Sequence, residues 1–280
     1  MTIFEAYNHT KQKLKNAGIE DSVFEAKIII KHITGLNNNQ ILTEYTKELT
    51  EFQQNNLTAI LRQREIRYPL QYILGEWDFY KYKFKVGVGV LIPRSDTEVL
   101  VEECAKFLKG KPSPKVLDLC AGSGCIGISL AKDFPDSAVV LVEKYTEALR
   151  YTEQNVKFNG AENTLVLEGD VFIGTANSES YDLIVSNPPY IPPSEMAITS
   201  PEVKFEPETA LLGGEDGLDF YRVIIENYKN SLKPQGMLAF EFGINEAGRV
   251  KSILTDHGFD NIKIVKDFNE IERVVTAIKV

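Results

Sequence analysis

The sequence is poor in the side chains that build metal and thiol sites. Its 280 residues include only three histidines and three cysteines, Cys104, Cys120 and Cys125. The cysteines form no Cys-x-x-Cys pair and the histidines are scattered, so the clusters typical of a zinc site or of a Cys/His nucleophile are missing. We therefore expect no bound metal, and reduced thiols rather than a disulfide framework.

The sequence also has no basic excess and no long apolar run. Its net charge of −9 argues against a broad nucleic-acid surface, although a local basic patch could lie within it. No run approaches the roughly 18 apolar residues of a membrane helix, and the first residues lack the layout of a signal peptide. We expect a cytoplasmic monomer that binds a protein or a small molecule, with no membrane and no direct nucleic-acid partner.

The length and the hydrophobic patterns predict two domains and a connector. Apolar residues make up 43% of the chain and charged residues 25%, as in ordinary globular proteins. Helical spacing predicts a small helical domain over residues 1–75, with breaks at Gly18 and Gly35. The period then changes to alternation, which predicts a β-hairpin connector over 76–95. A larger domain would occupy 96–280.

From Lys115 onward, apolar β-branched runs alternate with helical patterns. Strands that are buried on both faces and separated by helices are typical of a doubly wound, mostly parallel sheet. The fold class is thus α/β, with seven strands predicted in "KVLDLC", "AVVLVE", "TLVLEGD", "YDLIVSN", "MLAFEFG", "NIKIV" and "RVVTAIKV".

A glycine-rich loop follows the first of these strands. Gly122, Gly124 and Gly127 match the G-x-G-x-x-G spacing of dinucleotide-binding loops, and Glu143 ends the next strand, where a carboxylate can accept from ribose hydroxyls. The pair predicts a nucleoside-cofactor site. The alternative is a tight turn with a solvated glutamate.

Asp118 suggests which nucleoside cofactor is bound. A carboxylate at the mouth of the loop would repel a pyrophosphate, whereas S-adenosyl-L-methionine carries an ammonium and a sulfonium. The alternative is that Asp118 braces the loop through backbone N–H groups. Asp170 and Val171, after the third strand, are expected beside the adenine, where an acid can accept from its amino group.

The tetrapeptide Asn-Pro-Pro-Tyr ends the fourth strand, at the edge where such sheets bind ligands. Pro188 and Pro189 fix φ and stiffen the turn. The Asn187 oxygen and the Pro188 carbonyl then offer two acceptors for an –NH₂ group, and Tyr190 offers a flat face for a planar amide or base. We predict that Asn187, Pro188 and Tyr190 promote methyl transfer to a planar nitrogen; the alternative is an inert turn.

Several motifs together resemble one family. "DLCAGSG", Glu143 and "SNPPYIP" resemble class I methyltransferases that modify amino groups, and "PLQYILGEWDFY", "VLIPRSDTE", "FEPETALLGGEDGLDFYR" and "FEFG" resemble the release factor glutamine methyltransferase family (PrmC or HemK). The resemblance covers nearly the whole chain. It implies N5-methylation of the glutamine in the Gly-Gly-Gln motif of class 1 peptide chain release factors, with the helical domain docking that protein. The product would be S-adenosyl-L-homocysteine.

The resemblance also implies site residues. The family's glutamine-binding positions fall on Asn187, Pro188, Pro189 and Tyr190, and its cofactor positions fall on Cys120, Ala121, Gly122, Ser123, Gly124, Glu143, Val171 and Asn187. Cys120 stands where the family usually has glycine, and Glu143 stands where aspartate is common. "PRSDTE" at residues 93–98 differs from the usual PRPETE.

Other functions remain open on the sequence alone. The nearest rival is an N6-adenine or N2-guanine nucleic-acid methyltransferase, because the same tetrapeptide suits any planar exocyclic amine. A dinucleotide-dependent oxidoreductase and a non-catalytic cofactor-binding module are further alternatives.

Trp77, Phe79 and Phe84 are expected in the hairpin core rather than in a base-stacking platform. The segment 192–217 could close as a lid, and Glu206 within it either touches the substrate or pins the loop.

Overall fold

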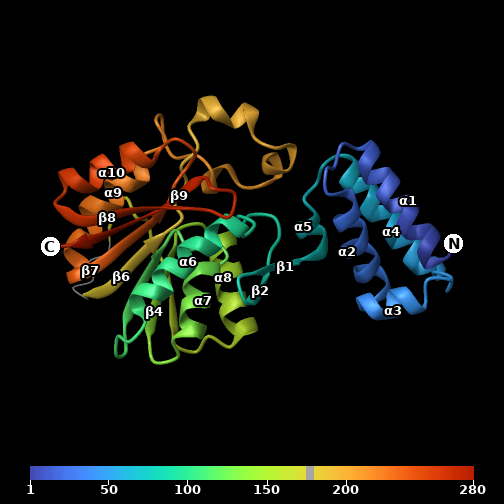
Figure 1. The fold of residues 1–280 in the computed structure, drawn as a ribbon, viewed down its shortest axis with the longest axis horizontal. Coiled ribbons are helices and arrows are strands. Elements are labelled where there is room, and N and C mark those ends of the chain that lie inside the picture. The colour runs from blue at the N-terminus through green and yellow to red at the C-terminus, as the bar shows by residue number, and fades with distance from the viewer. Residues whose placement is uncertain (175–179) are drawn as a thin grey trace. The chain divides into compact units, whose positions relative to one another are not determined.

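The computed structural model describes residues 1–174 and 180–280, and these divide into two compact units (Figure 1). The helical unit comprises residues 1–75 and 200–205, and the sheet unit comprises residues 76–199 and 206–280. The division after Gly75 falls where the hydrophobic period changes in the sequence. Nothing in the sequence pattern indicated that residues 200–205 belong with the helices.

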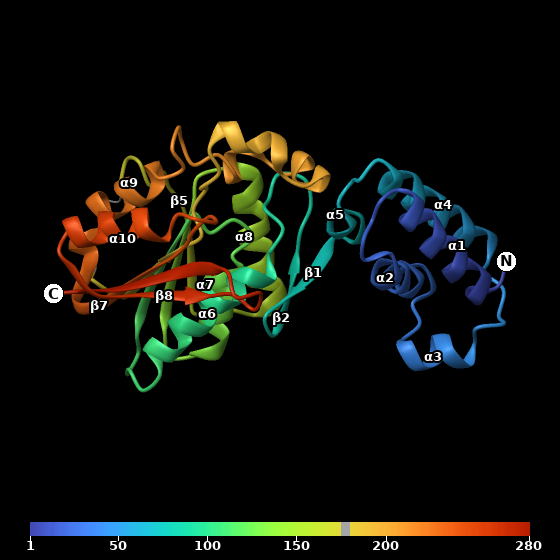
Figure 2. The same ribbon diagram turned by 45° about the horizontal axis from the view of Figure 1, so that its top comes forward.

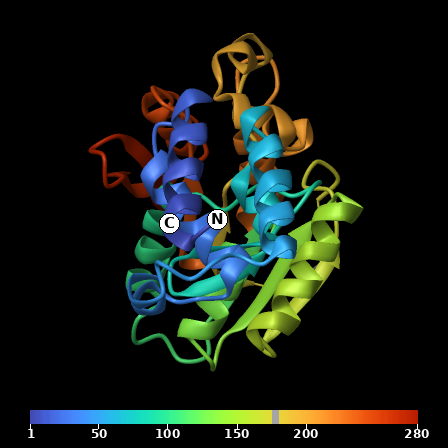
Figure 3. The same ribbon diagram turned by 90° about the vertical axis from the view of Figure 1, so that its right-hand side faces the viewer.

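The helical unit is built from five helices, several of them with clear start or stop signals (Figure 3, blue and cyan). Thr2 and Thr50 each cap a helix through a capping box, and Gly35 ends another in the left-handed conformation at φ 70°. Apolar side chains of four of these helices meet in a core that includes Ile30, Leu57 and Leu70. The helices are α1 (Ile3–Asn16), α2 (Ser22–Thr34), α3 (Asn38–Thr43), α4 (Glu51–Glu65) and α5 (Leu70–Leu74).

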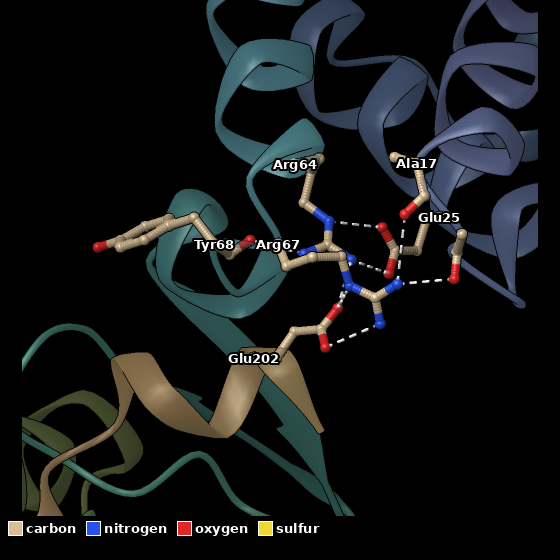
Figure 4. A network of polar contacts seen from close by, with 7 residues as sticks. Ala17, Glu25, Arg64, Arg67, Tyr68 and Glu202 are labelled. Atoms are coloured by element: carbon tan, nitrogen blue, oxygen red, sulfur yellow. Dashed lines mark hydrogen bonds and ion pairs between the residues drawn. The ribbon is translucent and has the colours of Figure 1, made fainter. Parts of the chain in front are cut away.

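A cluster of charges ties the 200–205 segment into this unit (Figure 4). Arg64 is 2% exposed and makes two 2.8 Å contacts to the carboxylate of Glu25. Arg67 donates to both oxygens of Glu202, at 2.7 and 2.9 Å. Glu202 lies in the 3₁₀ turn Pro201–Phe205. Ion pairs thus bind this turn to helices that lie far from it in the sequence.

The sheet unit contains the predicted seven-stranded sheet, in the order β5-β4-β3-β6-β7-β9-β8 (Figure 2). The pairs from β5 to β7 are parallel, and β9 runs antiparallel to both of its neighbours. The predicted α/β class is confirmed. The strands are β3 (Lys115–Leu119), β4 (Ala138–Glu143), β5 (Thr164–Glu168), β6 (Tyr181–Ser186), β7 (Leu232–Glu241), β8 (Phe259–Lys266) and β9 (Glu272–Lys279).

Two hydrophobic cores cover the two faces of this sheet, because its strands are apolar on both sides. One face carries α6 (Ser95–Leu108), α7 (Cys125–Asp133) and α8 (Thr146–Asn159), and the other carries α9 (Asp219–Tyr228) and α10 (Ala247–Asp256). The helical spacing in the sequence predicts a helix near Leu218 to Leu232. In the structure α9 ends at Tyr228, a 3₁₀ turn follows, and Leu232 already starts β7.

The hairpin packs on the α6 and α7 face of the sheet unit. It pairs β1 (Glu76–Phe79) with β2 (Tyr82–Lys85), and Phe79 and Phe84 are buried in that core, 5.9 Å apart between ring centroids. Trp77 is only half-buried.

Among residues 1–174 and 180–280, no helix is both long and apolar enough to cross a membrane.

Candidate functional site

A pocket opens at the carboxyl ends of the central strands, within the sheet unit. Its walls come from the loops after β3, β4, β5 and β6, from the connector before α6 and from the segment after the 200–205 turn. The predicted site residues that line it are Cys120, Ala121, Gly122, Ser123, Glu143, Asp170, Val171, Asn187 and Pro189. The sheet topology therefore brings residues from four separate strand ends to one cavity, as expected for a doubly wound fold.

The glycine loop is shaped by left-handed residues. Cys120, Gly122 and Gly124 have φ values of 59°, 58° and 79°. A Cβ on Gly124 would lie 2.7 Å from Ile128 Cδ1, and one on Gly127 would lie 2.4 Å from Leu141 Cδ2. Glycine is thus required for the turn and for the close approach of α7 to the sheet.

Asp118 lies beneath this loop rather than at its mouth. It is fully buried, its Oδ2 accepts from the Gly127 N–H at 2.9 Å, and the pocket walls do not include it. Burial raises the pKa of Asp118 to about 7. The predicted position at the mouth of the loop is wrong, and the geometry fits the loop-bracing alternative. The charge of Asp118 therefore does not identify the cofactor.

Glu143 holds the glycine loop and still faces the pocket. Its Oε2 accepts from the Gly122 N–H at 2.8 Å, and its Oε1 accepts from the N–H groups of Lys144 and Tyr145 at 2.8 and 2.9 Å. Burial raises the pKa of Glu143, and these three hydrogen bonds oppose the rise. A carboxylate has about four acceptor positions, so it keeps capacity for a ligand hydroxyl.

Asp170 and its neighbours form the next wall. The Asp170 carboxylate pairs with the Lys144 ammonium at 2.9 Å and accepts from the Phe172 N–H at 3.0 Å. Burial alone would raise the pKa of Asp170, but these two contacts lower it, so the group is ionised. Val171 and Phe172 add apolar surface beside it. An acceptor next to apolar walls suits a flat, amino-bearing ring.

The Asn-Pro-Pro-Tyr turn contributes two residues to the pocket and two behind it. Asn187 and Pro189 line the cavity, whereas Pro188 and Tyr190 do not. The Asn187 Nδ2 donates to Thr97 Oγ1 at 3.2 Å, and the Tyr190 hydroxyl donates to Glu241 Oε1 at 3.3 Å. Side-chain partners therefore fix both ends of the turn.

A second glycine loop packs against the same turn. A Cβ on Gly213 would lie 2.5 Å from Tyr190 Cα and 2.8 Å from the Pro189 oxygen. The Ile191 and Gly213 backbones also hydrogen-bond, with the Gly213 N–H donating to the Ile191 oxygen at 3.0 Å. Only glycine allows this approach of two backbones, so the turn is rigid from both sides.

Glu206 pins the segment that follows. Its side chain is fully buried, its Oε2 accepts from the Ile92 N–H at 3.0 Å, and its Oε1 pairs with Arg94. Of the two interpretations of Glu206, the contacts favour the one in which it pins the loop. The carboxylate joins the connector to the chain that leads into Pro207.

Part of the pocket was not identified from the residue patterns. Its walls also include Ile92, Pro93, Arg94, Thr97, Tyr145, Pro207, Thr209, Ala210 and Phe220. Only the family motifs "VLIPRSDTE" and "FEPETALLGG" gave a signal for most of them. Hydrophobic period cannot find such residues, because most of them come from irregular segments.

The pocket fits an adenosyl cofactor. Glu143 offers a carboxylate for hydroxyl groups, Asp170 lies beside apolar walls, and the loop residues Cys120 to Ser123 line the cavity. The part of the chain that the structure describes contains no group of three or more side chains that could hold a metal ion.

Comparisons with known proteins bear on the family and on the fold. The family model described as the PrmC N-terminal domain matches residues 5–75, and the one described as the methyltransferase small domain matches residues 95–200. A solved structure of the hMettl16 catalytic domain is similar with a TM-score of 0.57 and 13% identity, over 87% of each chain. That likeness shows the fold alone.

Two bacterial relatives match over nearly the whole of this chain. The release factor glutamine methyltransferase of Fusobacterium nucleatum is 38% identical over 277 residues, which cover 98% of this chain and 78% of that protein. That of Thermodesulfovibrio yellowstonii is 39% identical over 261 residues, which cover 92% of this chain and 93% of that protein. The chain therefore belongs to the release factor glutamine methyltransferase family.

Proposed function

We propose that this chain methylates the N5 nitrogen of the glutamine in the Gly-Gly-Gln motif of a class 1 peptide chain release factor. The observation that carries the proposal is the placement of Asn187 and Pro189 in the same pocket as Glu143 and the glycine loop. The relatives at 38–39% identity bear the name of this activity. Release factors are thus the proposed partner, and the cytoplasm is the proposed location.

S-adenosyl-L-methionine, when bound, supplies an electrophilic methyl group on a sulfonium. Glu143 would accept from its ribose hydroxyls and Asp170 from its adenine amino group, while Cys120, Ala121, Gly122, Ser123 and Gly124 form the loop around it. Val171 would pack on the adenine. Each of these roles rests on the position of the residue in or beside the pocket.

The Asn-Pro-Pro-Tyr turn would hold the substrate amide. The amide nitrogen is a poor nucleophile because its lone pair is delocalised. The Asn187 Oδ1 and the Pro188 carbonyl would accept its two hydrogens, and this would draw the nitrogen towards tetrahedral geometry and aim it at the methyl group. Pro189, on the pocket wall, would confine the planar amide, and Tyr190 would support the turn from behind the wall. The turn would thus accelerate the transfer mainly by positioning the amide nitrogen, without a covalent intermediate between enzyme and substrate.

The helical unit would dock the release factor. It exposes apolar side chains around one groove: Phe4 is 56%, Leu42 73% and Tyr45 51% exposed. Such side chains are typical of a protein-binding surface. We expect Phe4→Ser with Leu42→Ser to reduce methylation of the whole release factor but not of a short Gly-Gly-Gln peptide. The matched control is the exposed Phe268→Ser in the sheet unit, which should leave both rates unchanged.

A methyl-transfer assay with labelled donor tests the proposed reaction. The substrates are a class 1 release factor, the same factor with its motif glutamine replaced by glutamate, and total RNA and DNA. We expect transfer to the unaltered factor alone. Transfer to nucleic acid, with none to the factor, would favour the nucleic-acid alternative instead.

A further inference from the structure

Glu241 is a buried carboxyl group directly behind the Asn-Pro-Pro-Tyr turn. It ends β7, in which the preceding residues Met237 to Phe240 are all buried and apolar. Glu241 is itself only 2% exposed, and Ser186 pairs with Phe240, so Asn187 follows at the same level of the sheet. A buried carboxyl group destabilises the fold unless it is hydrogen-bonded, so its contacts need an explanation.

Three polar groups meet at this point. The Tyr190 hydroxyl donates to Glu241 Oε1 at 3.3 Å. The Thr97 hydroxyl, on the first turn of α6 and 2% exposed, is a second polar neighbour of this carboxyl group; burial raises the pKa of Glu241, and Thr97 as a hydrogen-bonding group lowers it. Glu241 Oε2 is buried and has no hydrogen-bond partner within residues 1–174 and 180–280. The carboxyl group can therefore accept a hydrogen bond from Thr97.

We propose that Glu241 is a positioning residue for the methyl transfer, acting on Asn187 through the Thr97 hydroxyl. The Asn187 Nδ2 lies 3.2 Å from Thr97 Oγ1. A hydroxyl has one proton, so a Thr97 that donates to Glu241 must accept from Asn187. The Asn187 NH₂ group then faces Thr97, and its Oδ1 faces the pocket as an acceptor.

Without Glu241 the direction of this chain of hydrogen bonds is no longer set. The Thr97 hydroxyl can then donate to Asn187 Oδ1, and the amide turns over. The Asn187 NH₂ group would face the substrate –NH₂ group, and two donors cannot hydrogen-bond each other. Glu241 thus decides whether the turn presents an acceptor or a donor, although it does not itself line the pocket.

The same carboxyl group fixes the second member of the turn. Tyr190 donates to Glu241 while a Gly213 Cβ would overlap Tyr190 Cα, so the tyrosine is held at its hydroxyl and at its backbone. One buried acceptor therefore orders both Asn187 and Tyr190. This inference rests on the proposed function, because it assigns the turn an acceptor role towards a substrate amide.

The test compares four single variants and one double variant on a release factor with saturating donor. We expect Glu241→Leu and Thr97→Val each to lower kcat about tenfold or more, since each removes a link of the chain of hydrogen bonds. Thr97→Ser keeps the hydroxyl and Glu241→Gln keeps an acceptor oxygen, so both should stay within about threefold of the unaltered enzyme. Affinity for S-adenosyl-L-homocysteine, measured by calorimetry, should change by less than about threefold in all of them.

The double variant Glu241→Leu with Thr97→Val gives the sharper result. Two residues that act in series should show no additional loss, so the double variant should match either single one. Additive losses in kcat, or a Thr97→Ser as slow as Thr97→Val, would overturn the proposal. If Glu241→Leu does not fold, the Thr97→Val and Thr97→Ser pair still decides it. Absence of methylation by the unaltered enzyme would instead refute the proposed function.

Discussion

Glu143→Ala should weaken cofactor binding and loosen the glycine loop at the same time. In the structure the carboxylate accepts three backbone N–H groups within 2.9 Å, from Gly122, Lys144 and Tyr145, and faces the pocket. A hydrogen bond to a charged group is worth about 1.5–3 kcal/mol, so loss of the ribose contact should raise the dissociation constant about 10- to 150-fold. The loop N–H groups would also lose their acceptor.

Calorimetric titration with S-adenosyl-L-homocysteine measures this loss directly. Glu143→Gln is the intermediate case, because its amide keeps one acceptor oxygen but must turn its NH₂ group towards at least one backbone donor. Its affinity should fall between those of the unaltered protein and the Glu143→Ala variant. The matched control is Glu147→Ala, whose side chain is 61% exposed and forms an ion pair with Arg150 on the surface of α8. An affinity of Glu143→Ala within about threefold of the unaltered protein would show that the residue only braces the loop.

Three further predictions concern the turn, the buried carboxyl groups and the helical unit. Asn187→Ala should lower kcat about 10²–10³-fold with little effect on donor affinity, by analogy with the loss of one preorganised hydrogen-bond partner, and single-turnover kinetics checks this. The pKa values of Asp118 and Glu241 are raised by burial to about 7, so just below that pH the folded state binds more protons than the unfolded state. The free energy of unfolding should therefore rise, by about 1–3 kcal/mol, as the pH falls from about 8 to about 6. Urea melts at several pH values measure this change, and a flat or opposite trend would refute it. Arg64→Ala leaves Glu25 without this ion pair and should destabilise the helical unit by about 3–5 kcal/mol, as measured by hydrogen exchange. The control Lys13→Ala, at an exposed ion pair, should destabilise it by less than about 1 kcal/mol. Equal effects of the two variants would contradict the reasoning.

The sheet could be predicted from the sequence because its strands carry a strong local signal. Each of the seven apolar runs became a strand, since strands buried on both faces need continuous apolar sequence. The start of β7 was missed because Pro234 and Gly236 are typical turn residues, although Leu232 already pairs with Tyr181. Tertiary pairing there outweighs the local preference.

The role of Asp118 could have been predicted from the alternation of side chains along β3. Val116 packs on one face of the sheet, and Leu117 and Leu119 pack on the other. Because neighbouring side chains of a strand point to opposite faces, Asp118 must point to the side of Val116, under α7, and not into the mouth of the loop. Strand alternation alone therefore favours the bracing role.

Long-range charge contacts could not be predicted from the residue pattern. Glu202 pairs with Arg67 across 135 positions of sequence, and Glu206 reaches Ile92 across 114. A single charged residue in an irregular segment gives no periodic signal, so neither partner could be named in advance. Glu241 was different, since a carboxylate inside the apolar run "MLAFEFG" already indicates a buried partner.

The most direct test of the account is to locate the added methyl group. The protein is incubated with S-adenosyl-L-methionine and a class 1 release factor, and the digested factor is analysed by tandem mass spectrometry. The account predicts one added methyl group on the side-chain nitrogen of the glutamine in the Gly-Gly-Gln peptide, and none when Asn187→Ala replaces the unaltered enzyme under the same short incubation. A methyl group on another residue of the factor, or an unmodified peptide with the unaltered enzyme, would contradict it.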